Sequence, residues 1–475
     1  MLFLLVAGFG AVITAGLLSG LHYTETASFC GRCHTMGPEM KAYNLSPHRQ
    51  VACAECHVKP GLLGAAEAKA NGAKQLFQVM TGTFPKPIPP PNHSSLPPVT
   101  ETCLRCHSLQ QITKNEGPVK IVLRPRYQLD ERNTQELVAL VLRPAGIGGD
   151  TTVLGVHWHV QQKVTYSSPD TGRTIDLVEV KRPDGTVEQY ISGTSVNVST
   201  EAQQDVAKVK NGETNRVMDC LDCHNRTGHG VPSIDQALDD SITAGRISRD
   251  LPFIKRDAVA LLNAKYPSLA AADRAMDGLG ASYRGNYPLI QRTKGAEIAA
   301  ASKELKQIYR LIATPEMKVE AKTYPNNLGH QTTLGCFRCH DGAHYQVVNG
   351  QLTQKVIPST CSTCHTFPQV GGAVTNILLG GAPDTHADKL YVFNHKKLVS
   401  TLDPNQASCG ACHDRTYCVN CHATGALKVN HDEMLYNHAA SIRKSGGQAC
   451  AYCHQAVYCA RCHRDPVLQT SAGGG

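Results

Sequence analysis

The sequence has few aromatic residues, few charged residues and no cysteine outside one short motif. Aromatic residues make up 5% of the 475 residues, with a single Trp, so something other than large rings has to fill much of the interior. Charged residues make up 18% and hydrophobic residues 41%, which excludes a disordered or collagen-like chain. The length favours about three domains. Because all 20 Cys belong to one motif, their even number does not indicate disulfides.

The motif is C-x-x-C-H, and it occurs ten times. It is typical of c-type haem attachment, in which two thiols form thioethers with the porphyrin and the His is the proximal iron ligand. We therefore predict ten covalently bound haem c groups in an exported chain, since this attachment takes place outside the cytoplasm. The predicted residues are Cys30, Cys33, His34; Cys53, Cys56, His57; Cys103, Cys106, His107; Cys220, Cys223, His224; Cys336, Cys339, His340; Cys361, Cys364, His365; Cys409, Cys412, His413; Cys418, Cys421, His422; Cys450, Cys453, His454; and Cys459, Cys462, His463.

Zinc is the alternative occupant of C-x-x-C pairs. His accounts for 22 of 475 residues, so chance places it after all ten Cys pairs with a probability on the order of one in ten trillion. Zinc sites would also pair the motifs at short spacing, whereas more than a hundred residues separate His107 from Cys220. Haem is therefore favoured over zinc.

The net charge does not indicate a nucleic-acid partner. The formal charge is +8, from 47 basic and 39 acidic residues. Each haem adds two propionates and, when ferric, about one positive charge, so ten ferric haems would add roughly −10. We therefore interpret most Lys and Arg as partners of propionates and as solvated surface, and we predict no nucleic-acid binding.

Residues 1–22 are predicted to form a membrane anchor, because residues 1–21 contain no charged residue and are long enough as a helix to cross a bilayer. A cleaved signal peptide is the alternative, although no basic n-region or small-x-small cleavage site is present. The haems set the orientation: we expect a single-pass protein of the inner membrane with its haem domains on the periplasmic or outer side. Small residues along the segment favour a packing partner in the membrane: Ala7, Ala11, Ala15, Gly16 and Gly20.

The remaining chain is predicted to form three domains. Residues 23–232 hold four haem motifs and a small β insertion at 119–197, where alternating apolar residues predict strands at 119–123, 153–160, 175–180 and 187–191. Residues 233–329 lack haem motifs, and apolar spacing predicts helices at 257–265 and 297–312. Residues 330–475 form a hexahaem domain in which two closely spaced pairs of motifs recur at an offset of 41 residues, beginning at Cys409 and Cys450. The fold class is a haem-cored multihaem cytochrome c of short α-helices and loops, with one transmembrane helix.

Twelve His lie outside the motifs, nearly the number needed to give every iron a second imidazole. An iron with two strong axial ligands transfers electrons but cannot bind a substrate. We expect at least eight of the twelve to be distal ligands and consider His22 and His93 the weakest candidates. The predicted distal ligands are His48, His157, His159, His229, His330, His344, His386, His395, His431 and His438.

Residues 1–232 resemble the NapC/NirT family of membrane-anchored quinol dehydrogenases. The resemblance rests on CGRCHTM at 30–36, SPH at 46–48, CAECHVKP at 53–60, and CLDCH at 220–224 followed by His229. The sequence at 324–345 resembles a longer branch that includes inner-membrane cytochromes of metal-respiring bacteria. The resemblance implies that Met36 ligates the first haem, that His48 and His229 are distal ligands, and that quinol binds beside the first haem.

The same resemblance places the quinol-site Lys and Asp on the helix that follows the second haem motif. That stretch offers Lys69 and Lys74, while Gln75 stands where an acid is expected. Menaquinol or ubiquinol is the implied substrate, which leads to a candidate quinol site of Met36, Lys69, Lys74 and Gln75.

These observations predict a membrane-anchored decahaem cytochrome that transfers electrons from quinol or a membrane redox partner to a soluble or outer-membrane cytochrome. One alternative is a conduit subunit of a larger complex that takes electrons from a partner protein. A terminal reductase of nitrite or hydroxylamine, with one open iron, is a weaker alternative because no motif departs from C-x-x-C-H.

Overall fold

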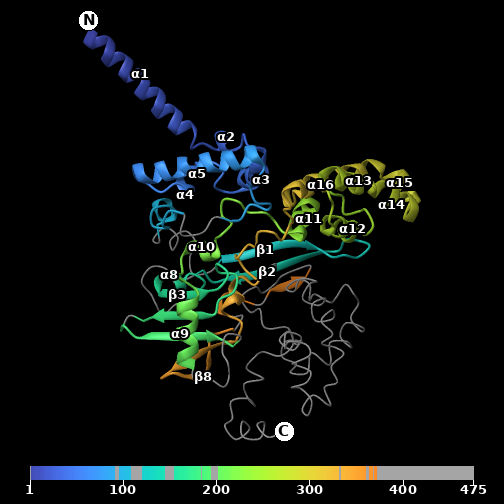
Figure 1. Ribbon diagram of the computed structural model, residues 1–475. Helices are drawn as coiled ribbons and strands as arrows, with labels where there is room; N and C mark the ends of the chain where they lie inside the picture. The colour runs from blue at the N-terminus through green and yellow to red at the C-terminus, as the bar shows by residue number, and fades with distance from the viewer. Residues whose placement is uncertain are drawn as a thin grey trace. The chain divides into compact units, whose positions relative to one another are not determined.

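The computed structural model describes residues 2–90, 96–108, 120–144, 155–182, 184–193, 202–330, 333–359, 363–366 and 368–371 (Figure 1). The chain forms two compact units, each built from three stretches. Unit 1 comprises residues 1–108, 129–133 and 224–326, and unit 2 comprises residues 109–128, 134–223 and 327–475. These limits do not follow the consecutive domains predicted from the sequence.

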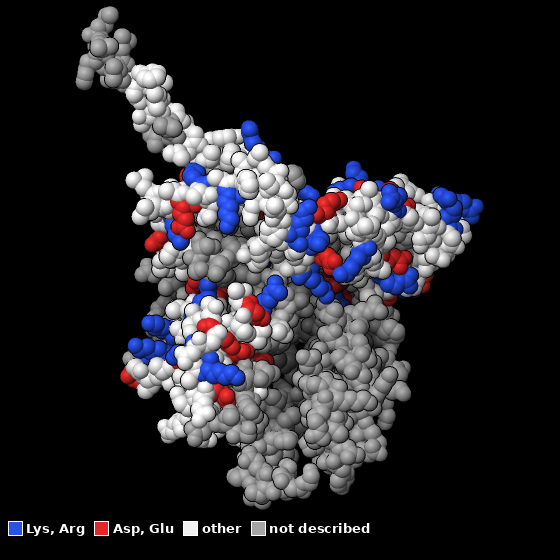
Figure 2. Space-filling model, in the orientation of Figure 1, with Lys and Arg blue, Asp and Glu red and all other residues white. Residues whose placement is uncertain are grey.

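Unit 1 begins with α1 (Leu2–Tyr23), which carries no Lys, Arg, Asp or Glu (Figure 2). It continues through α2 (Ala27–Cys30), the 3₁₀ turn η1 (His34–Met36), α3 (Gly37–Leu45), α4 (Cys53–His57), α5 (Gly61–Thr81) and α6 (Cys103–Cys106). Pro60 precedes α5, and Gly82 ends it in the left-handed region at φ 67°, where a side chain would be strained. Among the described residues, no helix meets the length and hydropathy required of a membrane span.

The second part of unit 1 is a helical bundle. It contains α11 (Ile234–Thr243), α12 (Ile254–Asn263), α13 (Leu269–Asp277), α14 (Leu279–Asn286), α15 (Pro288–Thr293), α16 (Gly295–Ile312) and η3 (Pro315–Met317). Helices α12 and α16 confirm the two helices predicted from apolar spacing. The buried face of α16 repeats every three to four residues, at Ile298, Ala301, Leu305, Ile308 and Ile312, and packs against α11 and α13.

Unit 2 contains two antiparallel sheets. The first has the order β1-β2-β9, from β1 (Lys120–Tyr127), β2 (Gln135–Leu142) and β9 (Gln369–Gly371). The second has the order β6-β3-β4-β5-β7-β8, from β3 (Lys163–Ser168), β4 (Leu177–Lys181), β5 (Val187–Ser192), β6 (Thr214–Val217), β7 (His344–Val348) and β8 (Gln351–Val356). Three short elements also lie in the described part of this unit: α8 (Trp158–Gln161), α10 (Cys220–Cys223) and η4 (Gly335–Arg338).

Residues of the larger sheet form two apolar clusters. Val206 and Val209 of α9 (Ala202–Gly212) pack with Leu177, Ile191 and Val347 in one cluster. The other cluster combines Val164, Tyr166, Val178, Val180 and Tyr190 with Cys339 of the fifth haem motif. The sheet therefore provides the support on which this motif is held.

The β structure is more extensive than the predicted insertion at 119–197. The strands expected at 119–123, 175–180 and 187–191 correspond to β1, β4 and β5, and the turn between β4 and β5 has Gly185 at φ 88°. Over its described residues, 155–160, the strand expected at 153–160 is wrong, because Gly155 begins a turn that leads into α8. Strands β6 to β9 lie beyond the predicted insertion, so the fold combines short helices with two sheets of substantial size.

Candidate haem sites

In each of four C-x-x-C-H motifs, the Cys lie on one helical turn or, for Cys339, directly after it, and the His follows the second Cys. The turns are α4, α6, α10 and η4. Residues three and four apart share a helix face, so this spacing brings two thiols and an imidazole to one side of the chain. A planar group bonded to both thiols would therefore meet the imidazole of the same motif.

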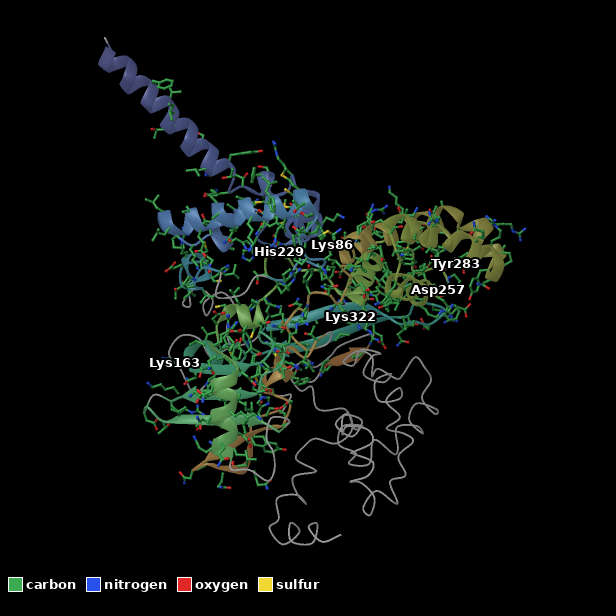
Figure 3. All side chains as sticks on the ribbon, in the orientation of Figure 1. Lys86, Lys163, His229, Asp257, Tyr283 and Lys322 are labelled. Carbon is green, nitrogen blue, oxygen red and sulfur yellow. The ribbon has the colours of Figure 1, made fainter. Side chains whose placement is uncertain are left out.

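Four motif imidazoles each face a second imidazole from a distant part of the chain. Within unit 1, the ring centroids of His48 and His107 are 5.9 Å apart, and those of His57 and His229 are 6.1 Å apart (Figure 3 labels His229). Within unit 2, the corresponding distances are 5.7 Å for His159 and His340 and 6.0 Å for His330 and His365. Each pair combines one predicted proximal ligand with one predicted distal ligand.

This spacing fits an iron between the rings. An imidazole nitrogen binds a metal at about 2 Å and lies about 1 Å from its ring centroid, so two trans imidazoles have centroids about 6 Å apart. One ring nitrogen of His48 is buried and lacks a hydrogen-bond partner among the described residues. The four pairs therefore fit bis-imidazole haem sites.

Hydrogen bonds to backbone carbonyls orient three of these rings. Nδ1 of His340 donates to the carbonyl of Pro358 at 2.6 Å, and Nδ1 of His365 donates to that of Thr366 at 2.6 Å. Nδ1 of His159 donates to the carbonyl of Val156 at 3.1 Å. Because Nδ1 carries the proton, Nε2 is left as the basic nitrogen that can bind a metal.

Two of the distal imidazoles lie in surroundings that favour the neutral form. Burial lowers the pKa of His159 and of His330, and the facing imidazole of each pair lowers it further. A metal ligand has to be the neutral imidazole, so these surroundings suit ligation.

A carboxylate contacts the distal imidazole of the second motif. Oε2 of Glu39, on α3, lies 3.1 Å from Nδ1 of His229, and Arg226 lies 3.8 Å from the same oxygen. The guanidinium of Arg226 in turn stacks on Tyr324, with its carbon 5.0 Å from the ring centroid. We did not predict Glu39 from the sequence, because 190 residues separate it from His229.

The Cys side chains show which motifs are neighbours within each unit. In unit 1, the thiol of Cys53 lies within hydrogen-bonding reach of Cys30, and Cys56 interacts electrostatically with Cys103. The first, second and third motifs therefore lie side by side.

In unit 2, the fourth and fifth motifs are joined through Arg338. Cys223 interacts with Cys336, and Arg338 donates to the carbonyl of Asp222 at 2.8 Å. The ring of His330 stacks on Phe337 at 4.3 Å, which brings the sixth site next to the fifth motif.

The surroundings of the described Cys side chains differ from those of typical zinc ligands. No cluster of three or more His, Cys, Asp and Glu suited to a metal ion occurs in the described part of the chain. Burial raises the pKa of Cys223 to about 11 and that of Cys339 to about 12, which disfavours the thiolate that zinc requires.

Two other candidate ligands have different surroundings within the described part of the chain. His344 is 1% exposed, and its nitrogens contact Oδ1 of Asp341 at 3.0 Å and the carbonyl of Ile175 at 2.8 Å. Both nitrogens are thus engaged, so the geometry favours a structural role for His344 rather than the predicted ligation. His157 immediately precedes α8, and its backbone N–H donates to the carbonyl of Pro144 at 3.3 Å.

The candidate quinol-site residues are not brought together. Nζ of Lys69 lies 2.7 Å from Oγ1 of Thr24 and 3.5 Å from Oε1 of Glu25, just beyond the end of α1. Lys74 and Gln75 are exposed and lie more than 100° from Lys69 around α5. Glu25 is therefore the acid that accompanies Lys69, a partner that spacing along α5 alone does not reveal.

Several predicted residues are not tested by the geometry. Met36 is half-buried at the end of η1, but the side chain of His34 lies outside the described residues. The seventh to tenth motifs, the 41-residue repeat, Cys361, His93, His386, His395, His431 and His438 also lie outside them.

Comparison with known proteins places this geometry in a family. Residues 1–87 match the N-terminal region of the NapC/NirT cytochrome c family. The chain is 35% identical over 361 residues to the cytochrome c-type protein ImcH of Geobacter sulfurreducens, covering 75% of this chain and 68% of that protein. It is 29% identical over 107 residues to the cytochrome c nitrite reductase subunit NrfH of Nitratidesulfovibrio vulgaris, covering 22% of this chain and 67% of that subunit. No solved structure matches the chain.

Proposed function

The chain belongs to the family of multihaem c-type cytochromes that includes ImcH, and from this premise we propose that it is a membrane-anchored decahaem cytochrome. We propose that it takes electrons from menaquinol or ubiquinol and delivers them to a soluble or outer-membrane cytochrome. The observation that carries the proposal is the set of four imidazole pairs with centroids 5.7–6.1 Å apart.

Haem c, when bound, supplies reversible one-electron chemistry at iron. The imidazoles that would hold the iron are those of His107 with His48, His57 with His229, His340 with His159, and His365 with His330. Two imidazoles saturate an iron, so these four sites suit electron transfer rather than substrate binding. The pairs therefore weigh against a terminal nitrite or hydroxylamine reductase at these four positions.

The order of neighbouring motifs supports electron transfer along the chain. Motifs one to three are adjacent in unit 1, and motifs four to six are adjacent in unit 2. We propose that electrons enter near the first motif and leave through the C-terminal motifs.

We propose that α1 anchors the protein in the inner membrane, with the haem domains on the periplasmic side. A helix of 22 residues extends about 33 Å, which matches a hydrocarbon core of about 30 Å. The side chains of Phe9 and Val12 are 69% and 70% exposed, which is costly in water and favourable in lipid.

We propose that quinol binds near the end of α1, where Lys69 and Glu25 form an ion pair. Quinol oxidation releases protons, and a carboxylate beside a Lys can accept one while the Lys holds the quinol oxygen. Glu25 would then provide the acid that Gln75 does not.

Reduction of the purified protein in lipid nanodiscs by a menaquinol analogue tests this function. We expect rapid reduction of the haem absorbance, and we expect Glu25→Gln and Lys69→Gln each to slow it, whereas Lys74→Gln should not. Absence of reduction of the wild type by the quinol, together with rapid reduction by dithionite, would favour the conduit subunit that takes electrons from a partner protein.

A further inference from the structure

Helix α5 exposes an apolar stripe that no described part of the protein covers. Leu62 is 90% exposed, Leu63 88%, Phe77 66% and Met80 78%. At about 100° per residue these four side chains fall within about 100° of arc, so they share one face of the helix.

Toward the two ends of α5 the covered residues lie on the other side of the helix, whereas residues 70–77 are all exposed. Gly64 is buried, and Ala68 and Val79 are half-buried. These three residues lie about 200°, 240° and 260° around the helix from Leu62. Helix α5 is therefore amphipathic in an unusual sense, because its large apolar side chains face away from the protein.

The apolar stripe faces the end of α1. Lys69 lies about 20° from Leu62 around the helix, just outside the arc of the stripe, and its Nζ contacts Thr24 and Glu25. Thr24 and Glu25 directly follow α1 (Leu2–Tyr23). The contacts of Lys69 with Thr24 and Glu25 therefore hold the apolar side of α5 close to the end of α1, where the proposed anchor leaves the bilayer.

We propose that α5 lies on the membrane surface and inserts Leu62, Leu63, Phe77 and Met80 into the lipid headgroup boundary. Such interfacial helices bury one apolar face by about 5–10 Å and keep the opposite face polar or protein-bound. This inference rests on the proposed anchoring by α1. It assigns a second lipid contact, which would fix the height of the first three motifs above the bilayer.

Thiol labelling of the full-length holoprotein tests the proposal. Every native Cys belongs to a haem motif, so an introduced Cys would be the one free thiol of a fully loaded protein. The variants are Leu63→Cys and Phe77→Cys on the stripe, with Asn71→Cys as the matched control. Asn71 is exposed on the same helix about 180° from Leu62.

The variants are reconstituted in nanodiscs of phosphatidylethanolamine and phosphatidylglycerol and treated with a charged or a lipid-soluble maleimide. We expect the charged reagent to modify Leu63→Cys and Phe77→Cys roughly tenfold more slowly than Asn71→Cys. The lipid-soluble reagent should modify the two stripe positions faster than the control.

Other outcomes overturn the proposal in distinguishable ways. Equal rates at all three positions would mean that the stripe faces water. Slow reaction of the stripe with both reagents would mean that haem, protein or a second copy covers it. Failure of the wild type to enter nanodiscs would instead refute anchoring by α1, and so would refute the proposed function separately from the placement of α5.

Discussion

Replacing Glu39 by Gln should raise the reduction potential of one haem. Glu39 places a carboxylate 3.1 Å from Nδ1 of His229, on the opposite side of the ring from the metal-binding nitrogen. A negative charge there stabilises the ferric over the ferrous state, both by its field and by increasing the basicity of the imidazole. Gln keeps the shape and an acceptor oxygen but removes the charge.

The magnitude follows from the geometry. A carboxylate about 7 Å from a unit charge interacts with it by about 2 kcal/mol at an effective dielectric constant of about 20. Arg226, 3.8 Å away, and the 25% exposure of the Glu39 side chain reduce this value. A net effect of about 1 kcal/mol corresponds to about 40 mV for one electron.

A spectroelectrochemical titration of the holoprotein measures the effect. We expect one component to move upward by about 40 mV and the others to stay in place. Glu67→Gln is the control, because it removes an exposed carboxylate of the same unit that pairs with Lys59 at 3.5 Å. An unchanged titration for Glu39→Gln, or a shift to lower potential, would refute the role assigned to Glu39.

Three further predictions concern unit 2 and the helical bundle. His159→Ala should leave one iron without its distal ligand and add a high-spin component to the EPR spectrum of the wild type; an unchanged spectrum would contradict the assigned pair. Burial, and a hydrogen bond that the protonated carboxyl of Glu213 donates to Asp176, raise the pKa of Glu213 to about 7, so stability should fall as pH rises from about 4.5 to 7. Chemical denaturation should show that Glu213→Gln raises the free energy of unfolding, relative to the wild type, by more at pH 8 than at pH 5. An equal increase at both pH values would contradict the raised pKa of Glu213. Asn133→Ala should lower the free energy of unfolding by about 2–4 kcal/mol, because the Asn133 side chain donates to two carbonyls of the helical bundle at 2.8 Å and accepts from the backbone N–H of Lys255. Differential scanning calorimetry should show a lower melting temperature for the variant, and an unchanged melting temperature would contradict the prediction.

Local features of the fold could be predicted from the sequence because short-range physics determines them. Apolar spacing predicted α12 and α16, and the turn at Gly185 predicted the hairpin of β4 and β5. The strand expected at 153–160 failed because its alternation of apolar residues begins at a glycine turn and continues into one helical turn. The pairing of β5 with β7 joins residues more than 150 positions apart, and no local pattern reveals it.

The same distinction applies to the sites. The motif spacing predicts proximal His and Cys residues by itself, since it fits one helical turn. The choice of distal partner depends on tertiary structure: His229 faces His57 across more than 170 residues, while His344, close to its own motif, forms two hydrogen bonds instead. The roles of Glu25 and Glu39 could not be predicted from the sequence, because the side chains that they contact lie on other segments of the chain.

Intact-mass spectrometry of the purified, denatured protein, combined with an iron determination, is the sharpest test of the ten predicted haem sites. We expect a covalent mass increment of ten haems and ten iron atoms per chain. A chain with the polypeptide mass alone, or one that carries zinc in place of iron, would contradict this prediction.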